Sequence, residues 1–90
     1  MSGKTSVYEV HFSAKAVKQL KALDPQVQRR IKGAVRKLEV FPPAADVARV
    51  RTRKGVYRLR VGDWRVFYSY KVTMRQVVII AIRPRERAYD

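Results

Sequence analysis

The 90-residue sequence predicts a single α+β domain, with two helices packed on one face of a small, mainly antiparallel sheet. Two observations lead to this prediction. Residues 56–71 alternate apolar and polar side chains on both sides of a Gly-Asp pair, as a β-hairpin does. Residues 13–41 instead place apolar side chains at helical spacing. We therefore expect the order β-α-α-β-β-β over residues 1–90.

The N-terminal segment predicts a strand followed directly by a helix. Val7–Phe12 alternates in character, with Glu9 and His11 on the face opposite the apolar side chains. Ser13 then suits the N-cap position of a helix, because its hydroxyl can accept a hydrogen bond from a free backbone N–H group. The apolar stripe of this helix consists of Ala16, Val17, Leu20 and Leu23.

A second helix is predicted to begin at Asp24-Pro25, a capping residue followed by proline at the first helical position. Pro42-Pro43 should end it, because proline lacks the N–H group that a helix interior needs. The connection between the two helices is so short that they should form an antiparallel hairpin. The apolar side chains of the second helix are Val27, Ile31, Ala34, Val35, Leu38 and Phe41.

The C-terminal half predicts three more strands after a loop over residues 44–55, which could hold a short extended piece near Val50. Val56–Val61 and Trp64–Lys71 flank Gly62-Asp63, a favourable hairpin turn. Gln76–Arg83 is almost continuously apolar, as a central strand is. We expect the N-terminal strand to join these three in one sheet, with the helices covering one face only.

The charge of the chain points to an anionic partner. Lysine and arginine number 21 against 7 acidic residues, which gives a net charge of +14. Nucleic acid fits better than a membrane, because the sequence has no apolar run of ~18 residues. An acidic protein partner, or a basic surface that is merely solvated, stays open. The chain contains no cysteine, and its first ten residues have no apolar signal core, so we expect a cytoplasmic protein.

Arginines should line the uncovered face of the sheet. Because strand side chains alternate between faces, Tyr57 and Leu59 can enter the core while Arg58 and Arg60 point outward. Arg65 has the position to join them. Fixed guanidinium groups on an open sheet favour an RNA phosphate backbone as the ligand. Three further arginines sit at or after the end of the last strand, within reach of the same face: Arg83, Arg85 and Arg87.

Two segments carry a family resemblance, "YRLRVGDWRVFY" at residues 57–68 and "RPRERAY" at residues 83–89. The chain resembles the RelE/ParE superfamily of bacterial toxins from type II toxin–antitoxin pairs, over nearly its whole length. The terminal segment is similar to the RelE branch. The resemblance implies a RelE-like fold and a metal-independent endoribonuclease that needs no cofactor. Such an enzyme, an mRNA interferase, cuts messenger RNA in the ribosomal A site and so inhibits translation.

In that branch the 2′-OH of the RNA is the nucleophile, and the products are a 2′,3′-cyclic phosphate and a 5′-OH. On this basis Arg65 and Arg85 are expected to stabilise the charge of the transition state, because guanidinium groups match phosphate oxygens. Tyr89 is the candidate general base, although it could equally stack on a base or orient the 2′-OH. The residues expected to hold RNA are Arg58, Arg60, Arg83, Arg87 and Phe67.

Other roles for these residues stay open. Arg65 could pair with Asp63, and Phe67 could pack in the core instead of stacking on a base. Pro84 stands where many relatives carry histidine or lysine, and positions 58 and 60 are arginine. No lysine or histidine in the matched positions can therefore transfer a proton. His11 is the only histidine, and the carboxylates show no metal-ligand spacing, so we expect no metal site.

The resemblance also implies partners. We expect an acidic, RelB-like antitoxin that covers the basic face or displaces the terminal segment, and contacts with mRNA and ribosomal RNA. DNA is expected to be bound only indirectly, through the antitoxin. Two alternative functions remain: a ParE-like inhibitor of DNA gyrase on the same fold, and an RNA- or ribosome-binding module without catalysis.

Overall fold

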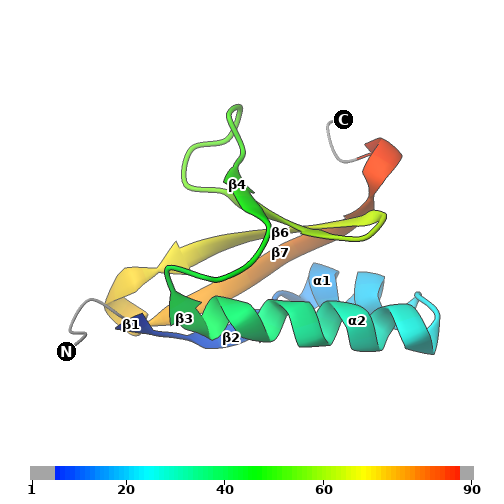
Figure 1. The fold of residues 1–90 in the computed structure, drawn as a ribbon, viewed down its shortest axis with the longest axis horizontal. Coiled ribbons are helices and arrows are strands. Elements are labelled where there is room, and N and C mark those ends of the chain that lie inside the picture. The colour runs from blue at the N-terminus through cyan, green and yellow to red at the C-terminus, as the bar shows by residue number, and fades with distance from the viewer. Residues whose placement is uncertain (1–5, 88–90) are drawn as a thin grey trace.

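The computed structural model describes residues 6–87 and confirms the predicted α+β architecture. Helices α1 (Ala14–Lys21) and α2 (Pro25–Val35) run antiparallel below one face of a five-stranded sheet (Figure 1). The strand order is β2-β7-β6-β5-β4, and only the pairing of β2 with β7 is parallel. The strands are β2 (Glu9–Phe12), β4 (Val47–Arg49), β5 (Tyr57–Val61), β6 (Trp64–Lys71) and β7 (Gln76–Pro84).

The predicted boundaries were wrong at both ends of the helical hairpin, where a second, two-stranded sheet forms. Strand β1 (Ser6–Val7) pairs antiparallel with β3 (Val40–Phe41) instead of continuing into β2. Helix α2 therefore stops at Val35, and a 3-10 turn over Arg36–Glu39 leads into β3. Phe41 was expected to be helical, and this was wrong because β1, distant in sequence, offers Val40 and Phe41 a pairing partner. The Tyr8 N–H donates to the Glu39 carbonyl at 2.7 Å, which joins the two sheets.

The hydrophobic core lies between the helices and the lower face of the large sheet. As predicted, Leu59 is 1% exposed, while its neighbours Arg58 and Arg60 lie on the other face. At one end of the core, aromatic side chains make edge-on and stacked contacts with ring centroids 5.2–5.7 Å apart, and Phe41 joins them from the surface, where it is 43% exposed. These rings belong to Tyr8, Phe41, Tyr57, Tyr68 and Tyr70.

Side-chain hydrogen bonds join helix α1 to β7 beyond the end of β2, where β2 no longer pairs with the edge of β7. The Ser13 hydroxyl accepts the Ala16 N–H at 3.1 Å, which confirms the predicted N-cap, and donates to the Ile80 carbonyl at 3.1 Å. The Gln19 side chain accepts the Ile82 N–H at 2.6 Å. Ile80 is the extra residue of a β-bulge, because the register shifts between Phe67 and Tyr68 of β6. The helix therefore satisfies backbone groups that no strand pairs.

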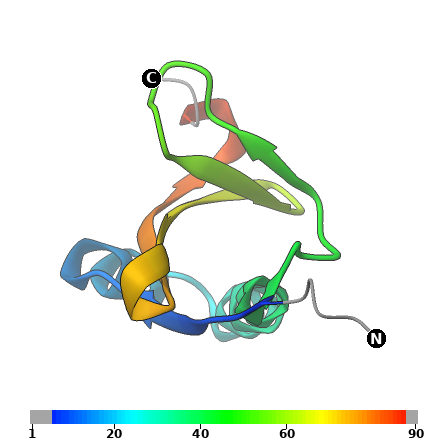
Figure 2. The ribbon, with the colours of Figure 1, turned by 90° about the vertical axis from the view of Figure 1, so that its left-hand side faces the viewer.

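Among the described residues, no α-helix covers the upper face of the sheet. The connection between β4 and β5 rises from this face as a hairpin, and the 3-10 turn η3 (Arg85–Arg87) rises at the other end of it (Figures 1 and 2). Within residues 6–87, no helix is long and apolar enough to cross a membrane.

Candidate functional site

Three arginines form one row across the upper face of the sheet. Arg60 of β5 lies opposite Arg65 of β6, and Arg65 lies opposite Arg83 of β7. Cross-strand partners point to the same face, so the three side chains leave the sheet from neighbouring positions on that face. Like charges placed opposite each other on a sheet are destabilising, and an anion bound between them would remove that cost. This row, called the arginine row below, is an arrangement suited to a phosphate group.

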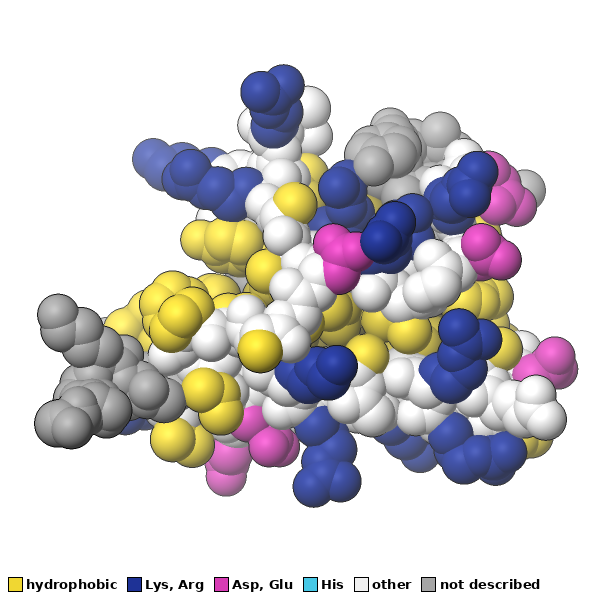
Figure 3. Space-filling view, in the orientation of Figure 1, with side chains coloured by type: hydrophobic (Ala, Val, Ile, Leu, Met, Phe, Trp, Pro, Cys, Tyr) yellow, Lys and Arg dark blue, Asp and Glu magenta, His cyan; other side chains and the backbone are white. Residues whose placement is uncertain are grey.

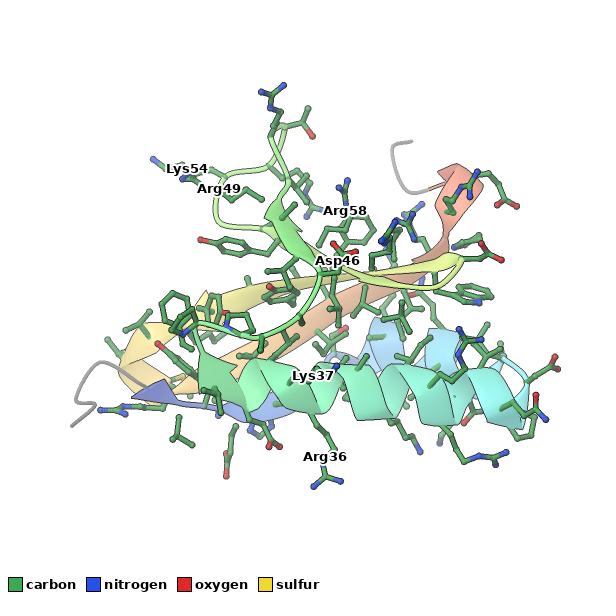
Figure 4. The ribbon with its side chains drawn as sticks, viewed as in Figure 1. Arg36, Lys37, Asp46, Arg49, Lys54 and Arg58 are labelled. Atoms are coloured by element: carbon green, nitrogen blue, oxygen red, sulfur yellow. The ribbon has the colours of Figure 1, made fainter. Side chains whose placement is uncertain are left out.

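The arginine row borders a pocket of about 350 Å³, lined by Asp46, Ala48, Arg58, Arg60 and Arg65. The structure therefore brings together three of the arginines expected from the sequence. Arg58 is half-buried and lies opposite Phe67, one row away from Arg60. Figure 4 shows Arg58 and Asp46 on the side of the hairpin that faces η3. The pocket is open to solvent and polar, as a site for a charged backbone has to be.

Asp46 is a functional candidate that sequence reasoning missed. Its Oδ2 lies 2.6 Å from Arg60 Nε, and the backbone N–H of Arg60 donates to the backbone carbonyl of Asp46 at 2.9 Å. Both side chains of the pair are more than half exposed. A carboxylate in this pocket competes with phosphate for Arg60 and is also a group that can accept a proton. The available signal was that Asp46 is the sole acidic residue between Glu39 and Asp63.

Arg65 is held more rigidly than the other members of the row. It is 8% exposed, and its Nη1 donates to the Gly62 carbonyl at 2.9 Å and to the Trp64 carbonyl at 3.0 Å. These bonds tie the guanidinium group to the β5–β6 turn, so the pairing with Asp63 considered from the sequence is replaced by contacts with backbone oxygens. A preorganised cation needs little rearrangement when charge develops next to it.

Arg85 lies in a neighbouring pocket and not in the arginine row. Its backbone N–H donates to the Asp63 carbonyl at 2.8 Å, which anchors the start of η3 to the β5–β6 turn. Its exposed side chain lines a pocket of about 480 Å³ with Asp63, Trp64, Pro84 and Glu86. The same turn thus fixes Arg65 through Gly62 and Arg85 through Asp63. The Arg87 side chain and Tyr89 lie outside the described residues.

Phe67 has the expected parity, since it points to the upper face, but its ring is buried there. It is 7% exposed and packs with Val56 and Ala81, and two partly buried side chains, Val50 and Ile80, complete this second apolar cluster. In this conformation the ring offers little surface for stacking on a base. Its position supports the packing role that the sequence left open.

Two tyrosines of β6, Tyr68 and Tyr70, do not supply an ionised group to the site. Burial raises the pKa of Tyr68, and the nearby Tyr70 adds to this effect. Burial likewise raises the pKa of Tyr70. Both phenols face the core and remain neutral at physiological pH. No group of three His, Asp or Glu side chains within residues 6–87 lies close enough together to hold a metal ion.

Comparisons with known proteins agree with this fold. Residues 10–89 match the family model described as the ParE toxin of the type II toxin–antitoxin system parDE. A protein of Methanocaldococcus jannaschii named as the toxin RelE1 is 31% identical over 85 residues, covering 91% of this chain and 94% of its own length.

Two solved structures are also similar. The archaeal RelE–RelB complex of Pyrococcus horikoshii gives a TM-score of 0.73 at 31% identity, with 91% of this chain and 99% of that chain covered. The intact RelBE toxin–antitoxin complex of E. coli gives a TM-score of 0.68 at 26% identity, with 89% and 99% covered.

Proposed function

Because the chain belongs to the RelE/ParE superfamily of type II toxin–antitoxin toxins, we propose that it is a ribosome-dependent endoribonuclease that cuts messenger RNA. The observation that carries the proposal is the arginine row. Three arginines at neighbouring positions on an open sheet face fit the negative charge of a phosphodiester and of the transition state formed from it.

The proposed reaction uses the RNA as its own nucleophile. The 2′-oxygen attacks the adjacent phosphorus, the bond between phosphorus and the 5′-oxygen breaks, and a 2′,3′-cyclic phosphate and a 5′-OH result. The proton of the 2′-OH passes to a base, and the leaving 5′-oxygen takes up a proton. Positioning supplies much of the rate, because the 2′-oxygen must be aligned with the bond that breaks. We expect the ribosome to provide that alignment.

Each expected site residue keeps a specific role in this proposal. Arg65 and Arg85 stabilise the developing charge, supported by their shared anchoring to the β5–β6 turn. Tyr89 remains the candidate base, with Asp46 as the alternative proton acceptor within the described pocket. The residues that hold the RNA backbone are Arg58, Arg60, Arg83 and Arg87, whereas Phe67 supports the sheet surface beside them.

An acidic, RelB-like antitoxin is the proposed protein partner. The similar structures of P. horikoshii and E. coli are RelE–RelB complexes, and the net charge of +14 favours an acidic binding segment. Coverage of the arginine row by such a segment would block RNA. DNA would then be contacted through the antitoxin.

A second candidate function is inhibition of DNA gyrase. The family model that matches residues 10–89 is described as the ParE toxin, and this observation favours it. A gyrase inhibitor has no need of an arginine row, so the arginines should be replaceable without loss of toxicity. An RNA-binding module without catalysis would bind message and leave it intact.

Primer extension on a message in reconstituted translation separates these functions. We expect cuts only when ribosomes are present, and far fewer cuts with Arg83→Ala or Arg85→Ala. Tyr89→Phe tests the base assignment, which fails if that variant cuts at the wild-type rate. Intact message together with lost supercoiling activity of gyrase would replace the proposal by the ParE-like function.

A further inference from the structure

The hairpin between β4 and β5 carries a second concentration of positive charge. Residues 49–56 contain four cationic side chains and no acidic one. All four are exposed: Arg49, Arg51, Arg53 and Lys54. The segment encloses a hollow of about 650 Å³ and projects from the molecule, with blue side chains at its tip (Figure 3). A projecting element of this kind can reach a ligand that the sheet surface cannot.

This hairpin is a fixed platform. The Val50 N–H donates to the Val56 carbonyl at 2.9 Å, and the Val56 N–H donates to the Arg53 carbonyl at 3.2 Å. Gly55, with φ at +79°, supplies the left-handed turn that closes it. Val50 and Val56 then pack on Phe67 in the second apolar cluster. Because the base is packed and hydrogen-bonded, its cations lose less conformational entropy on binding than cations on an unstructured loop.

Two of these cations point away from the arginine row. Arg49 lies opposite Tyr57, whose ring faces the core, whereas Ala48 and Arg58 share the upper face. Figure 4 shows Arg49 and Lys54 on the side of the hairpin opposite to Arg58. A phosphate held in the arginine row therefore cannot also contact these two side chains. They are available to another stretch of backbone.

We propose that the β4–β5 hairpin is a second RNA-binding site, which holds the phosphate backbone of a folded RNA separate from the strand in the arginine row. A protruding element with four exposed cations suits the closely spaced phosphates of a stem, where two strands converge. Folded RNA is contacted mainly through shape and phosphates, which requires cations and no base-reading groups. The choice of RNA over other polyanions rests on the proposed function. The hairpin would hold the RNA scaffold while the arginine row holds the strand to be cut.

Binding to two uncleavable RNAs tests this site without any cleavage step. The probes are a 2′-O-methyl RNA stem-loop and a 2′-O-methyl trinucleotide, followed by fluorescence anisotropy over a range of KCl concentrations. The test protein is the double variant Arg49→Ala/Lys54→Ala. Its matched control is Lys32→Ala/Arg36→Ala on α2 and the turn after it, where Arg36 points away from the sheet (Figure 4). Each double variant loses one exposed lysine and one exposed arginine.

We expect the hairpin variant to bind the stem-loop at least tenfold more weakly, and the slope of log K against log salt to fall by about 2. Its affinity for the trinucleotide should stay within twofold of the wild-type value. Arg60→Ala, in contrast, should lower the affinity for the trinucleotide. The control variant should change stem-loop affinity less than threefold. Equal losses in the two double variants, or no loss with the hairpin variant, would overturn the proposal.

Poly-L-glutamate serves as a probe for an acidic polypeptide. If the hairpin variant loses affinity for it and not for the stem-loop, the hairpin is a protein-binding site and the proposal is wrong. Unchanged melting temperatures of all variants show that folding is intact. Because neither RNA can be cut, failure of the endoribonuclease proposal in the translation assay leaves this measurement interpretable.

Discussion

Asp46 forms an ion pair with Arg60, the first arginine of the arginine row, with 2.6 Å between Oδ2 and Nε. The Asp46 carboxylate lies in the pocket that would receive phosphate. Exposed ion pairs contribute little to stability, at most about 1 kcal/mol. The larger effect should be on binding, because the carboxylate repels phosphate and occupies Arg60.

Asp46→Asn should therefore bind RNA several-fold more tightly, with stability changed by less than about 1 kcal/mol. Anisotropy with the uncleavable trinucleotide measures the affinity, and urea unfolding measures the stability. Ser69→Ala on β6 is a neutral control away from the pocket. If Asp46→Asn keeps its affinity but no longer cuts message, Asp46 takes part in proton transfer, and the competition described above is not its main role.

Replacing Arg65 and Arg83 should have different effects on stability. Arg65→Ala removes two hydrogen bonds from a buried charged group to backbone carbonyls and should lower the free energy of unfolding by about 1–3 kcal/mol. Arg83→Ala removes a neighbouring like charge and should leave stability unchanged or raised. Urea unfolding of the two variants provides the comparison. A large loss of stability in Arg83→Ala would show that the row does not carry this repulsion.

Two glycine substitutions should have opposite signs. Gly62 has φ at +58°, and a Cβ there would lie 2.8 Å from Arg30 Nη2, so Gly62→Ala should cost about 1–2 kcal/mol. Gly33 is inside α2, and a Cβ added there would meet nothing beyond its own helix within 4 Å, so Gly33→Ala should stabilise by about 0.5–1 kcal/mol. Thermal unfolding measures both changes.

The contribution of Arg30 can be separated by a double-mutant cycle. In an Arg30→Ala background the cost of Gly62→Ala should fall to the backbone strain alone. An undiminished cost would mean that the guanidinium group moves aside freely.

Stability should fall in alkaline solution because of Tyr68 and Tyr70. Burial raises the pKa of both phenols in the folded state, so the unfolded chain ionises first as the pH rises. The unfolded state then binds fewer protons, and the free energy of unfolding decreases above a pH of about 10. The limiting slope is about 1.4 kcal/mol per pH unit for each tyrosine. Urea unfolding from pH 8 to pH 11 should show this decline, and Tyr68→Phe should make it shallower.

Local patterns predicted the elements, and distant pairing accounts for what they missed. Alternation placed Arg58 and Arg60 correctly on the open face, and Ser13 caps α1 as expected. Asp24 occupies the N-cap of α2 but makes no side-chain cap hydrogen bond. Spacing cannot show whether a capping side chain completes its bond, since that depends on its rotamer.

The candidate site was predicted in part. Parity and the two-residue turn predicted Arg60 and Arg65 on one face, because hairpin register follows from such a turn, whereas Arg83 was expected only within reach of that face. Parity could not show that Phe67 is covered, because the cover comes from Val50 and Val56 in a loop. Asp46 was missed for a related reason: it meets Arg60 only through the β4–β5 pairing, which no short pattern in the loop indicated.

The parallel pairing of β2 with β7 joins the first strand of the large sheet to the last, with Glu9 opposite Gln76. Contacts so distant in sequence form late in folding, because a long loop must close before they contribute. Arg83 is on this last strand of the large sheet, so the arginine row is complete only after β7 has been synthesised. A nascent chain therefore has no complete arginine row until β7 has left the ribosome and paired with β6.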